Sequence, residues 1–268
     1  MDTPISDQEF TLFQRLIYKI AGINLSDNKK ALVVGRLQRR LGEYGHQSFG
    51  EYYRMLASGD HPEELQIMVD QLTTNETYFF REPGHFDFLR ETVLPQLRAS
   101  PSVRLWSAAS STGEEAFTLA MLLSEYRAQQ PWEIFASDIS TKVLARAQKA
   151  HYPLDRNEGI PPEFLRKYCL KGVRSQAGTF LIRPELRNRV TFRQVNLTLP
   201  VDPKIGTFNV IFLRNVMIYF DIETKRKVVA NLMPRLTTGG YFIIGHSESL
   251  NGLCDELEAV RPTIYRKI

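Results

Sequence analysis

A loop of small residues followed by two glutamates is the segment best suited to hold a ligand. It covers residues 107–115 and reads Ser-Ala-Ala-Ser-Ser-Thr-Gly-Glu-Glu. Small side chains let a ligand approach the backbone closely. The loop matches neither the G-x-x-x-x-G-K-[ST] pattern nor the G-x-G-x-x-G pattern of phosphate sites. Because it lacks a lysine and places Glu114 and Glu115 at the start of a helix, it favours a cationic ligand over a phosphate.

A third acidic residue, Asp138, closes the strand expected after this loop. An acidic residue at that place typically accepts hydrogen bonds from ribose hydroxyls. An aspartate after a strand can equally be a helix cap, so this residue alone leaves both interpretations open. Together with the acidic loop it favours S-adenosyl-L-methionine, a nucleoside with a sulfonium and an ammonium but no phosphate.

The elements that would position these residues alternate between helix and strand from about residue 79. We expect helices at 84–97, 114–126, 141–150 and 222–236, and strands at 103–108, 132–137, 208–213 and 241–245. This alternation predicts an α/β fold with a doubly wound, mostly parallel sheet. Residues 152–190 interrupt it with many turn formers. Within them, 169–174 and 179–183 could pair as an antiparallel hairpin, which we interpret as an inserted β-subdomain.

The first 75 residues predict a small all-helical domain that precedes the α/β domain of residues 76–268. Capping-box spacing occurs at Ser6–Glu9 and Ser48–Glu51. Ser26 is a candidate cap for a second helix, and Asp60 for a fourth with Pro62 in its first turn. Each of these signals stands before an apolar pattern of helical period.

Composition excludes several classes of protein. The chain has 268 residues, 43% hydrophobic and 24% charged, with a net charge of +4, so nucleic acid is not an expected partner. Cys169 and Cys254 are too few for a disulfide framework or a zinc pattern. The start Met1-Asp2-Thr3-Pro4 lacks the features of a signal peptide, and the apolar runs are too short to span a bilayer. We therefore expect a soluble, cytoplasmic monomer without membrane insertion.

Six segments together resemble the chemotaxis receptor methyltransferases, the CheR family. They are Thr-Thr-Asn-Glu-Thr-Tyr-Phe-Phe-Arg-Glu (73–82), Leu-Trp-Ser-Ala-Ala-Ser-Ser-Thr-Gly-Glu-Glu (105–115), Ala-Ser-Asp-Ile-Ser (136–140), Gln-Val-Asn-Leu (194–197), Arg-Asn-Val-Met-Ile-Tyr-Phe (214–220) and Gly-His-Ser-Glu-Ser (245–249). The resemblance runs in order over nearly the whole chain. It implies a class I, Rossmann-like methyltransferase that transfers methyl groups from S-adenosylmethionine to glutamates in the cytoplasmic helical domain of chemoreceptors, during adaptation. S-adenosylhomocysteine would be the second product.

The resemblance also implies which residues hold the cofactor. Asn75, Thr77 and Arg81 would reach over it, and Asp138 would hold the ribose. The full set is Asn75, Thr77, Arg81, Glu115, Asp138, Asn196, Leu197, Arg214 and Asn215, with Glu114 as the alternative to Glu115. Several have a simpler structural interpretation: Asn75 and Thr77 as caps, Arg81 as a surface ion pair, Asn196 as a turn residue and Leu197 as a core position.

The expected reaction needs no general base, because a glutamate side chain, with a pKa of about 4.3, is already ionised at neutral pH. What remains is in-line positioning and partial desolvation of the carboxylate. Tyr219 is the first candidate to hold that carboxylate and Arg98 the second. His46, His61, His85 and His151 show no ligand spacing, and His246 is interpreted as a brace for its loop, so no metal site is expected.

Basic residues of the second expected helix are candidates for binding the substrate. Lys29, Arg36, Arg39 and Arg40 fall on one arc at helical spacing, with no acidic residue after Asp27. Such a stripe would attract glutamate-rich receptor helices. A solvated helix face is the alternative.

Two other functions stay open. Residues 215–219 faintly resemble the Asn-Pro-Pro-Tyr motif of N-methyltransferases that act on nucleic acid or protein amides, but both prolines are missing. A non-catalytic module that binds S-adenosylmethionine is the other possibility.

Overall fold

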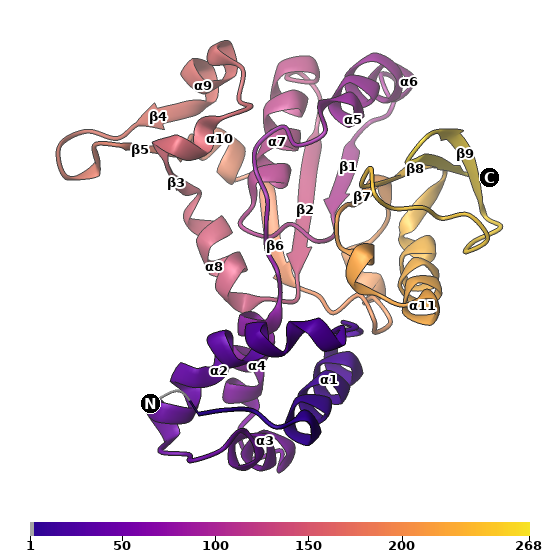
Figure 1. The fold of residues 1–268 in the computed structure, drawn as a ribbon. Coiled ribbons are helices and arrows are strands. Elements are labelled where there is room, and N and C mark those ends of the chain that lie inside the picture. Colours follow the sequence, from indigo (N-terminus) through magenta and orange to yellow (C-terminus); the bar gives the residue numbers. More distant parts are fainter. Residues whose placement is uncertain (1–2) are drawn as a thin grey trace.

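The computed structural model describes residues 3–268. Met1 and Asp2, which belong to the segment used to argue against a signal peptide, lie outside the described residues. A helical unit formed by the first four α-helices lies at the end of a large sheet toward which the arrowheads of strands β1 and β2 point (Figure 1). In the described part of the chain, no helix is long and apolar enough to cross a membrane.

The helical unit contains α1 (Asp7–Ala21), α2 (Lys30–Tyr44), α3 (Phe49–Ala57) and α4 (Pro62–Leu72). The capping box of Ser6 and Glu9 is confirmed, and Ser48 caps α3 through the amide of Glu51. The prediction for Ser26 is wrong, since a 3-10 turn (Asp27–Lys29) precedes α2 and the Ser26 side chain does not cap it. His61, not Asp60, occupies the N-cap of α4.

The large sheet confirms the predicted fold class. Its order is β6-β2-β1-β7-β8-β10-β9, and all neighbouring pairs up to β8 are parallel, while β10 is antiparallel to both β8 and β9. The strands are β1 (Val103–Ser107), β2 (Trp132–Asp138), β6 (Val190–Gln194), β7 (Phe208–Leu213), β8 (Leu236–Ile244), β9 (Leu257–Arg261) and β10 (Ile264–Lys267). Sequence analysis missed β6, β9 and β10, because their partly exposed residues form no continuous apolar run.

The predicted boundary between the last helix and the last parallel strand is wrong. Helix α11 (Ile222–Leu232) ends early, and β8 runs from Leu236 through Gly239 and Gly240 instead of starting after them. A Cβ atom on Gly240 would lie 2.8 Å from the carbonyl oxygen of Asn209. These glycines therefore allow close approach of two strands at a register shift rather than ending an element.

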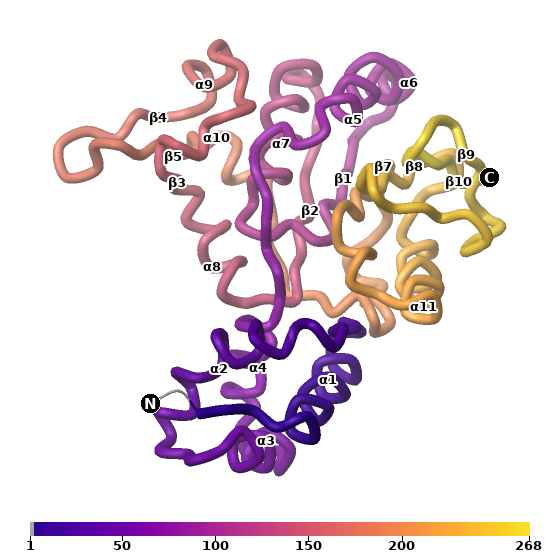
Figure 2. The backbone as a smooth tube through the Cα atoms, in the orientation of Figure 1, coloured from indigo at the N-terminus to yellow at the C-terminus, as the bar shows by residue number. Residues whose placement is uncertain are grey.

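Alternating side chains divide the sheet between two cores. Trp106, Ile211 and Phe242 belong to a core that continues into α11 and the helical unit. Leu105 and Val210 belong to the other core, which includes α7 (Glu114–Tyr126) and the helical segment 83–96, where α5 (Pro83–Phe88) and α6 (Leu94–Gln96) flank a π-helical turn. The helical unit thus shares a core with one side of the sheet, and it lies at the carboxyl ends of the parallel strands (Figure 2).

The inserted segment forms a second, three-stranded antiparallel sheet of order β3-β5-β4. The predicted hairpin is confirmed as β4 (Cys169–Lys171) and β5 (Thr179–Ile182), with β3 (His151–Pro153) added on the other side. Helices α8 (Thr141–Lys149), α9 (Pro162–Tyr168) and α10 (Pro184–Arg187) flank it in sequence, and the sheet projects from one side of the molecule (Figure 1).

Candidate functional site

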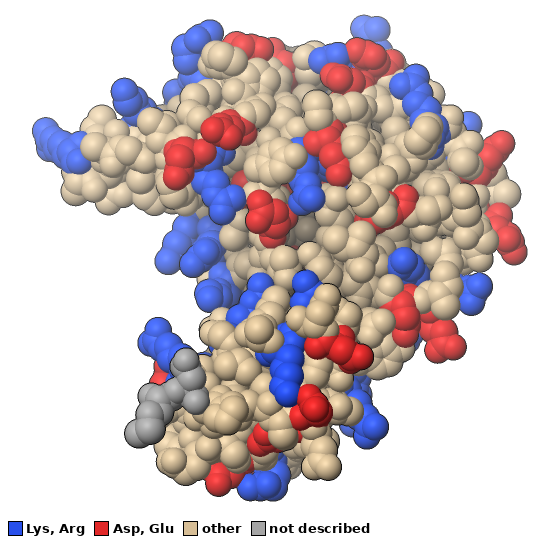
Figure 3. Space-filling view, viewed as in Figure 1, with Lys and Arg blue, Asp and Glu red and all other residues tan. Residues whose placement is uncertain are grey.

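A pocket lies at the carboxyl ends of β1, β2 and β7, between the sheet and the helical unit. Strand β1 lies between β2 and β7, and the chain moves outward from β1 through β2 to β6 before it crosses back to β7 on the other side. This reversal of strand order is the switch point where open α/β sheets bind ligands. The surface is hollowed where the two units meet (Figure 3). Predicted site residues that line the pocket are Lys29, Asn75, Thr77, Arg81, Glu115, Asp138, Asn196, Leu197, Arg214, Asn215 and Tyr219.

The loop after β1 turns only one of its two glutamates toward the pocket. Glu115 lines the pocket, where it accepts hydrogen bonds from the Ser107 hydroxyl (2.6 Å) and the Arg214 guanidinium (2.9 Å). Glu114 is buried, and its carboxylate accepts from the Thr112 hydroxyl at 2.6 Å. Burial raises the pKa of Glu114 above its ordinary value. The geometry therefore favours Glu115 as the ligand-facing acid.

Asp138, at the end of β2, holds the same loop in place. Its carboxylate accepts hydrogen bonds from the backbone amides of Ser111 (2.9 Å) and Ser140 (3.0 Å). Burial raises the pKa of Asp138 although these amides favour its ionised form. The Ser140 hydroxyl, not Asp138, caps α8. Asp138 thus shapes the pocket and lines it at once.

The segment of residues 73–82 crosses the pocket between the helical unit and α5. The Asn75 carbonyl accepts from the Ser111 hydroxyl (2.9 Å), and the Thr77 carbonyl accepts from Arg156 of the inserted segment (2.8 Å). The Arg81 guanidinium donates to the Glu76 carbonyl (2.9 Å) within the same segment. The loop after β1 and the inserted segment therefore hold this crossing segment in place through hydrogen bonds to its backbone.

Arg214 lies buried between two carboxylates at the end of β7. It donates to Glu115 (2.9 Å) and to Glu82 (3.0 Å), and its Nε has no hydrogen-bond partner among the described residues. Asn215 donates to the second oxygen of Glu82 at 3.1 Å. Burial opposes ionisation of Glu82, but Asn215 and Arg214 outweigh it and lower its pKa to about 2. The positively charged Arg214 therefore lies between the carboxylates of Glu115 and Glu82 at the pocket wall.

Glu82 and Glu248 are site residues that sequence analysis did not select. Glu248 accepts the backbone amides of Asn215 (2.9 Å) and Met217 (2.7 Å), so it fixes the loop that leads to Tyr219. Both glutamates lie inside segments quoted for the family resemblance, next to residues that were selected. Adjacency in those segments was the only signal available.

Asn196 and Leu197 line the pocket, and their polar groups also form hydrogen bonds to other elements. The Asn196 amide donates to the Ile20 carbonyl of α1 at 2.6 Å, which links the sheet to the helical unit. The Leu197 carbonyl accepts from Asn231 at 2.9 Å. Across the pocket, the Tyr219 carbonyl accepts from Asn24 at 2.8 Å, and among residues 3–268 its hydroxyl has no hydrogen-bond partner.

The structure does not bring Arg98 to the pocket. Arg98 is exposed and lies before β1, at the edge of the sheet opposite the carboxyl ends, where its carbonyl accepts from Gln130 at 3.0 Å. The expectation that Arg98 holds the substrate carboxylate is therefore corrected, since a parallel strand separates it from the pocket. Arg81 and Arg214 are the arginines that line the pocket.

The prediction of a continuous, exposed basic stripe on α2 is wrong. Arg40 is paired with the buried Glu64, which also accepts from the Tyr52 hydroxyl at 2.6 Å. Helix α2 is longer than expected and includes Glu43, which pairs with Arg39 at 3.0 Å. Arg36 donates to the Thr73 carbonyl at 2.9 Å beside the crossing segment.

Of the four predicted basic residues, Arg39 keeps a side chain that is 90% exposed, and Lys29 lines the pocket. Arg40 instead joins α2 to α4 inside the helical unit. Figure 3 shows lysine and arginine side chains on the viewed face where the helical unit meets the sheet, with acidic side chains below them. The stripe is therefore divided into a mostly buried structural arginine, Arg40, a half-buried Arg36 and two exposed cations, Lys29 and Arg39.

The fold and the pocket define a class of protein. A switch-point pocket with an acidic loop, a buried aspartate after the second strand and no phosphate-binding loop is the arrangement expected of an S-adenosylmethionine-dependent methyltransferase. Two family models match the chain. The model described as "CheR methyltransferase, SAM binding domain" matches residues 75–266, and "CheR methyltransferase, all-alpha domain" matches residues 8–73.

The chain belongs to the CheR methyltransferase family, which confirms the resemblance and the cofactor, S-adenosylmethionine. It is 39% identical to the chemotaxis protein methyltransferase of Escherichia coli, over 97% of this chain and 91% of that protein. It is 40% identical to chemotaxis protein methyltransferase 2 of Pseudomonas aeruginosa, over 96% and 92%. For the Borreliella burgdorferi chemotaxis protein methyltransferase the identity is 37%, over 98% and 95%.

Proposed function

We propose that this protein methylates glutamate side chains in the cytoplasmic helical domain of chemoreceptors. The observation that carries the proposal is similarity to chemotaxis protein methyltransferases over nearly the whole chain, including the helical unit. The glutamate target and the helical shape of the substrate come from the family resemblance. The protein would act in the cytoplasm as a monomer.

The residues present fit S-adenosylmethionine. Glu115 supplies negative charge for its cationic end, and Asp138 lies at the place where ribose hydroxyls are usually bound. Arg81 and Arg214 offer guanidinium donors for its carboxylate, and the buried Nε of Arg214 is without a partner. The whole proposed set is Asn75, Thr77, Arg81, Glu115, Asp138, Asn196, Leu197, Arg214 and Asn215.

The chemistry supplied by the bound cofactor is an electrophilic methyl group on a sulfonium. The chain's own contribution is to hold an ionised glutamate in line and to exclude water. Tyr219 lines the pocket, and its hydroxyl makes no hydrogen bond to the described residues, so this hydroxyl is our candidate to donate to the incoming carboxylate. A single donor positions the nucleophile without neutralising it, which is what transfer to a carboxylate requires.

For the receptor, we propose Lys29, Arg36 and Arg39 as the contacting cations and remove Arg40 from that role. Arg39 is the cleanest test, because its side chain is exposed and its one ion pair among residues 3–268 is with Glu43. Arg39→Glu should lower methyl transfer to receptors several-fold while cofactor affinity stays unchanged. Arg226→Glu is the control, an exposed arginine of α11. Equal transfer rates in both variants would remove Arg39 from the proposal.

The experiment for the function as a whole is radiolabelled methyl transfer from S-adenosylmethionine to isolated receptor membranes. A glutamyl methyl ester releases volatile methanol in mild alkali, whereas an N-methyl group stays on the protein. Alkali-labile label is the expected result. Stable label would support the N-methyltransferase alternative, and cofactor binding in calorimetry without any transfer would support a non-catalytic binding module.

A further inference from the structure

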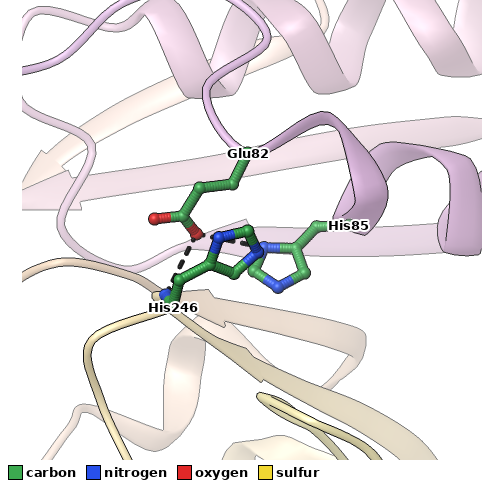
Figure 4. A group of neighbouring side chains, drawn as sticks. All are labelled: Glu82, His85 and His246. Carbon is green, nitrogen blue, oxygen red and sulfur yellow. Dashed lines mark hydrogen bonds and ion pairs between the residues drawn. The ribbon is translucent and has the colours of Figure 1, made fainter.

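A buried histidine beside the pocket wall faces a carboxylate with no proton donor between them. The His85 side chain is 3% exposed, and its Nδ1 lies 3.5 Å from Oε2 of Glu82 (Figure 4). Among the described residues this Nδ1 has no hydrogen-bond partner. A buried polar atom without a partner is costly, so the arrangement calls for a physical reason.

The network around His85 fixes which ring nitrogen carries the proton. The other nitrogen, Nε2, lies 2.8 Å from the hydroxyl of Thr263, and that hydroxyl donates to the Pro262 carbonyl at 2.5 Å. With the hydroxyl proton assigned to the Pro262 carbonyl, Thr263 accepts and Nε2 is assigned as the donor. Nδ1 therefore presents a lone pair to Glu82, and two acceptors face each other across a gap that a cation would fill.

A third possible ligand comes from the loop after β8. His246 is exposed, and its ring centroid lies 5.0 Å from that of His85. One ligand atom from each of Glu82, His85 and His246 lies within 4.8 Å of the others. Figure 4 shows the three side chains converging from two separate segments. Two imidazoles and one carboxylate with a solvent-facing side are the ligand set of open zinc sites.

We propose that Glu82, His85 and His246 form a binding site for a divalent transition-metal ion of the Zn²⁺ type. The hydrogen bond from His85 Nε2 to Thr263 matches the outer contact by which metal-binding histidines are usually oriented. Spacing in the sequence gave no hint of this site, because its histidines lie on segments far apart in the chain. The expectation of no metal ligands is replaced by this proposal.

The site would oppose cofactor binding. Glu82 Oε2 also accepts from Arg214 (3.0 Å), and Oε1 accepts from Asn215 (3.1 Å), and both of these residues line the cofactor pocket. A metal ion that takes Oε2 competes with the Arg214 guanidinium for the same oxygen. Coupling between two binding equilibria is reciprocal, so the metal weakens the cofactor and the cofactor weakens the metal by the same factor.

The binding test uses the full chain after treatment with a chelator. Calorimetry with ZnCl₂ and visible absorption with Co²⁺ should both show one site in the wild type. His246→Ala, a change at an exposed residue, and His85→Gln should each weaken Zn²⁺ binding at least ~10-fold, because even orienting contacts of metal ligands contribute that much. His151→Ala is the control, an exposed histidine on β3. Equal affinity in wild type and His246→Ala, or no binding, overturns the site.

The coupling test measures affinity for S-adenosylhomocysteine with and without saturating Zn²⁺. The wild type should lose several-fold in affinity when the metal is present, and His246→Ala should lose none. Unchanged affinity in the wild type overturns the antagonism. This half depends on the pocket being the cofactor site, whereas metal binding does not. Methyl transfer assayed in chelator tests the proposed function separately, so the two can fail independently.

Discussion

Two arginines in this protein, Arg40 with a side chain that is 16% exposed and Arg214 with one that is 2% exposed, are held by glutamates in different ways. In the helical unit, Arg40 donates to Glu64 at 2.8 Å, and Tyr52 donates to the same carboxylate at 2.6 Å. At the pocket, Arg214 donates to Glu115 at 2.9 Å and to Glu82 at 3.0 Å. Both clusters pair an arginine with glutamate, so charge alone does not distinguish them.

The difference lies in the polar atoms that remain. No side-chain atom of the Arg40 cluster is among the buried atoms without a partner in the described residues. Arg214 Nε is such an atom, and the nearby Tyr219 hydroxyl also has no partner within residues 3–268. A cluster whose polar atoms are all hydrogen-bonded within the protein stabilises the fold. Donors without a hydrogen-bond partner at a pocket wall indicate instead where a ligand binds.

Charge reversal of Arg40 should give the largest effect on stability. Arg40→Glu would place a second carboxylate beside that of the buried Glu64. Removing one partner of a buried ion pair costs about 3–5 kcal/mol. Urea unfolding followed by circular dichroism measures the loss. Arg39→Glu, on the exposed face of the same helix, should stay within about 1 kcal/mol of the wild type. A similar small loss in Arg40→Glu would show that its cluster is not structural.

Removal of Arg214 should act mainly on the cofactor. Arg214→Met deletes the donor with an unpartnered Nε and leaves Glu115 and Glu82 facing each other, so affinity for S-adenosylmethionine should fall about 100-fold, or ~3 kcal/mol. Calorimetry measures it, with circular dichroism to verify folding. Arg98→Met is the matched control at the opposite edge of the sheet. If both variants bind like the wild type, spare donors do not mark the ligand.

Loss of the spare hydroxyl should affect turnover rather than affinity. Tyr219→Phe keeps the ring in the pocket wall and removes one donor to the substrate carboxylate, so kcat should fall about 10-fold, or ~1.4 kcal/mol, with little change in cofactor affinity. Tyr18→Phe is the control, since the Tyr18 hydroxyl donates to Asp221 at 2.7 Å on the surface. Turnover unchanged in Tyr219→Phe would contradict the assigned role.

Sequence reasoning located the pocket because its signals are local. The small-residue loop, the aspartate after the second strand and the alternating elements each depend on neighbours in the chain, and the structure places Glu115 and Asp138 on one pocket wall. The choice between Glu114 and Glu115 needed the geometry of the first helical turn, which points one inward and one toward the ligand. The edge strand β9 and its neighbour β10 escaped detection because they alternate weakly in burial.

What sequence could not supply was pairing across distant segments. Arg40 was assigned to a free surface because its partner, Glu64, lies on another helix. The choice of Arg98 failed because a residue before a parallel strand lies at the end of the sheet opposite the pocket. Glu82 approaches Arg214 only through the crossing segment, whose Phe80 and Glu82 have positive φ of 56° and 58°. Such backbone conformations are not signalled by these residue types.

The smallest predicted effect is the loss of folding stability in acid that comes from the Arg40–Glu64 cluster. Burial alone would raise the pKa of Glu64, but the hydrogen bonds from Arg40 and Tyr52 outweigh it and hold the pKa below its ordinary value of 4.5. The folded state therefore favours the ionised form. This contribution to stability is complete above about pH 4.5 and is lost as the pH falls below that value. Protonation removes the charge but keeps several hydrogen bonds, so the change is smaller than that of charge reversal.

Glu64→Gln isolates this contribution, because glutamine keeps the shape of the side chain and does not titrate. Free energies of unfolding from urea titrations between pH 7 and pH 3.5 should fall for both proteins, since other carboxylates with lowered pKa, such as Glu82, are common to both. The wild type starts more stable and should fall more steeply, so the two curves should converge at low pH. Parallel curves would mean that the Arg40 cluster, although fully hydrogen-bonded, adds no charge-dependent stability. The distinction between the two arginines would then depend on the pocket alone.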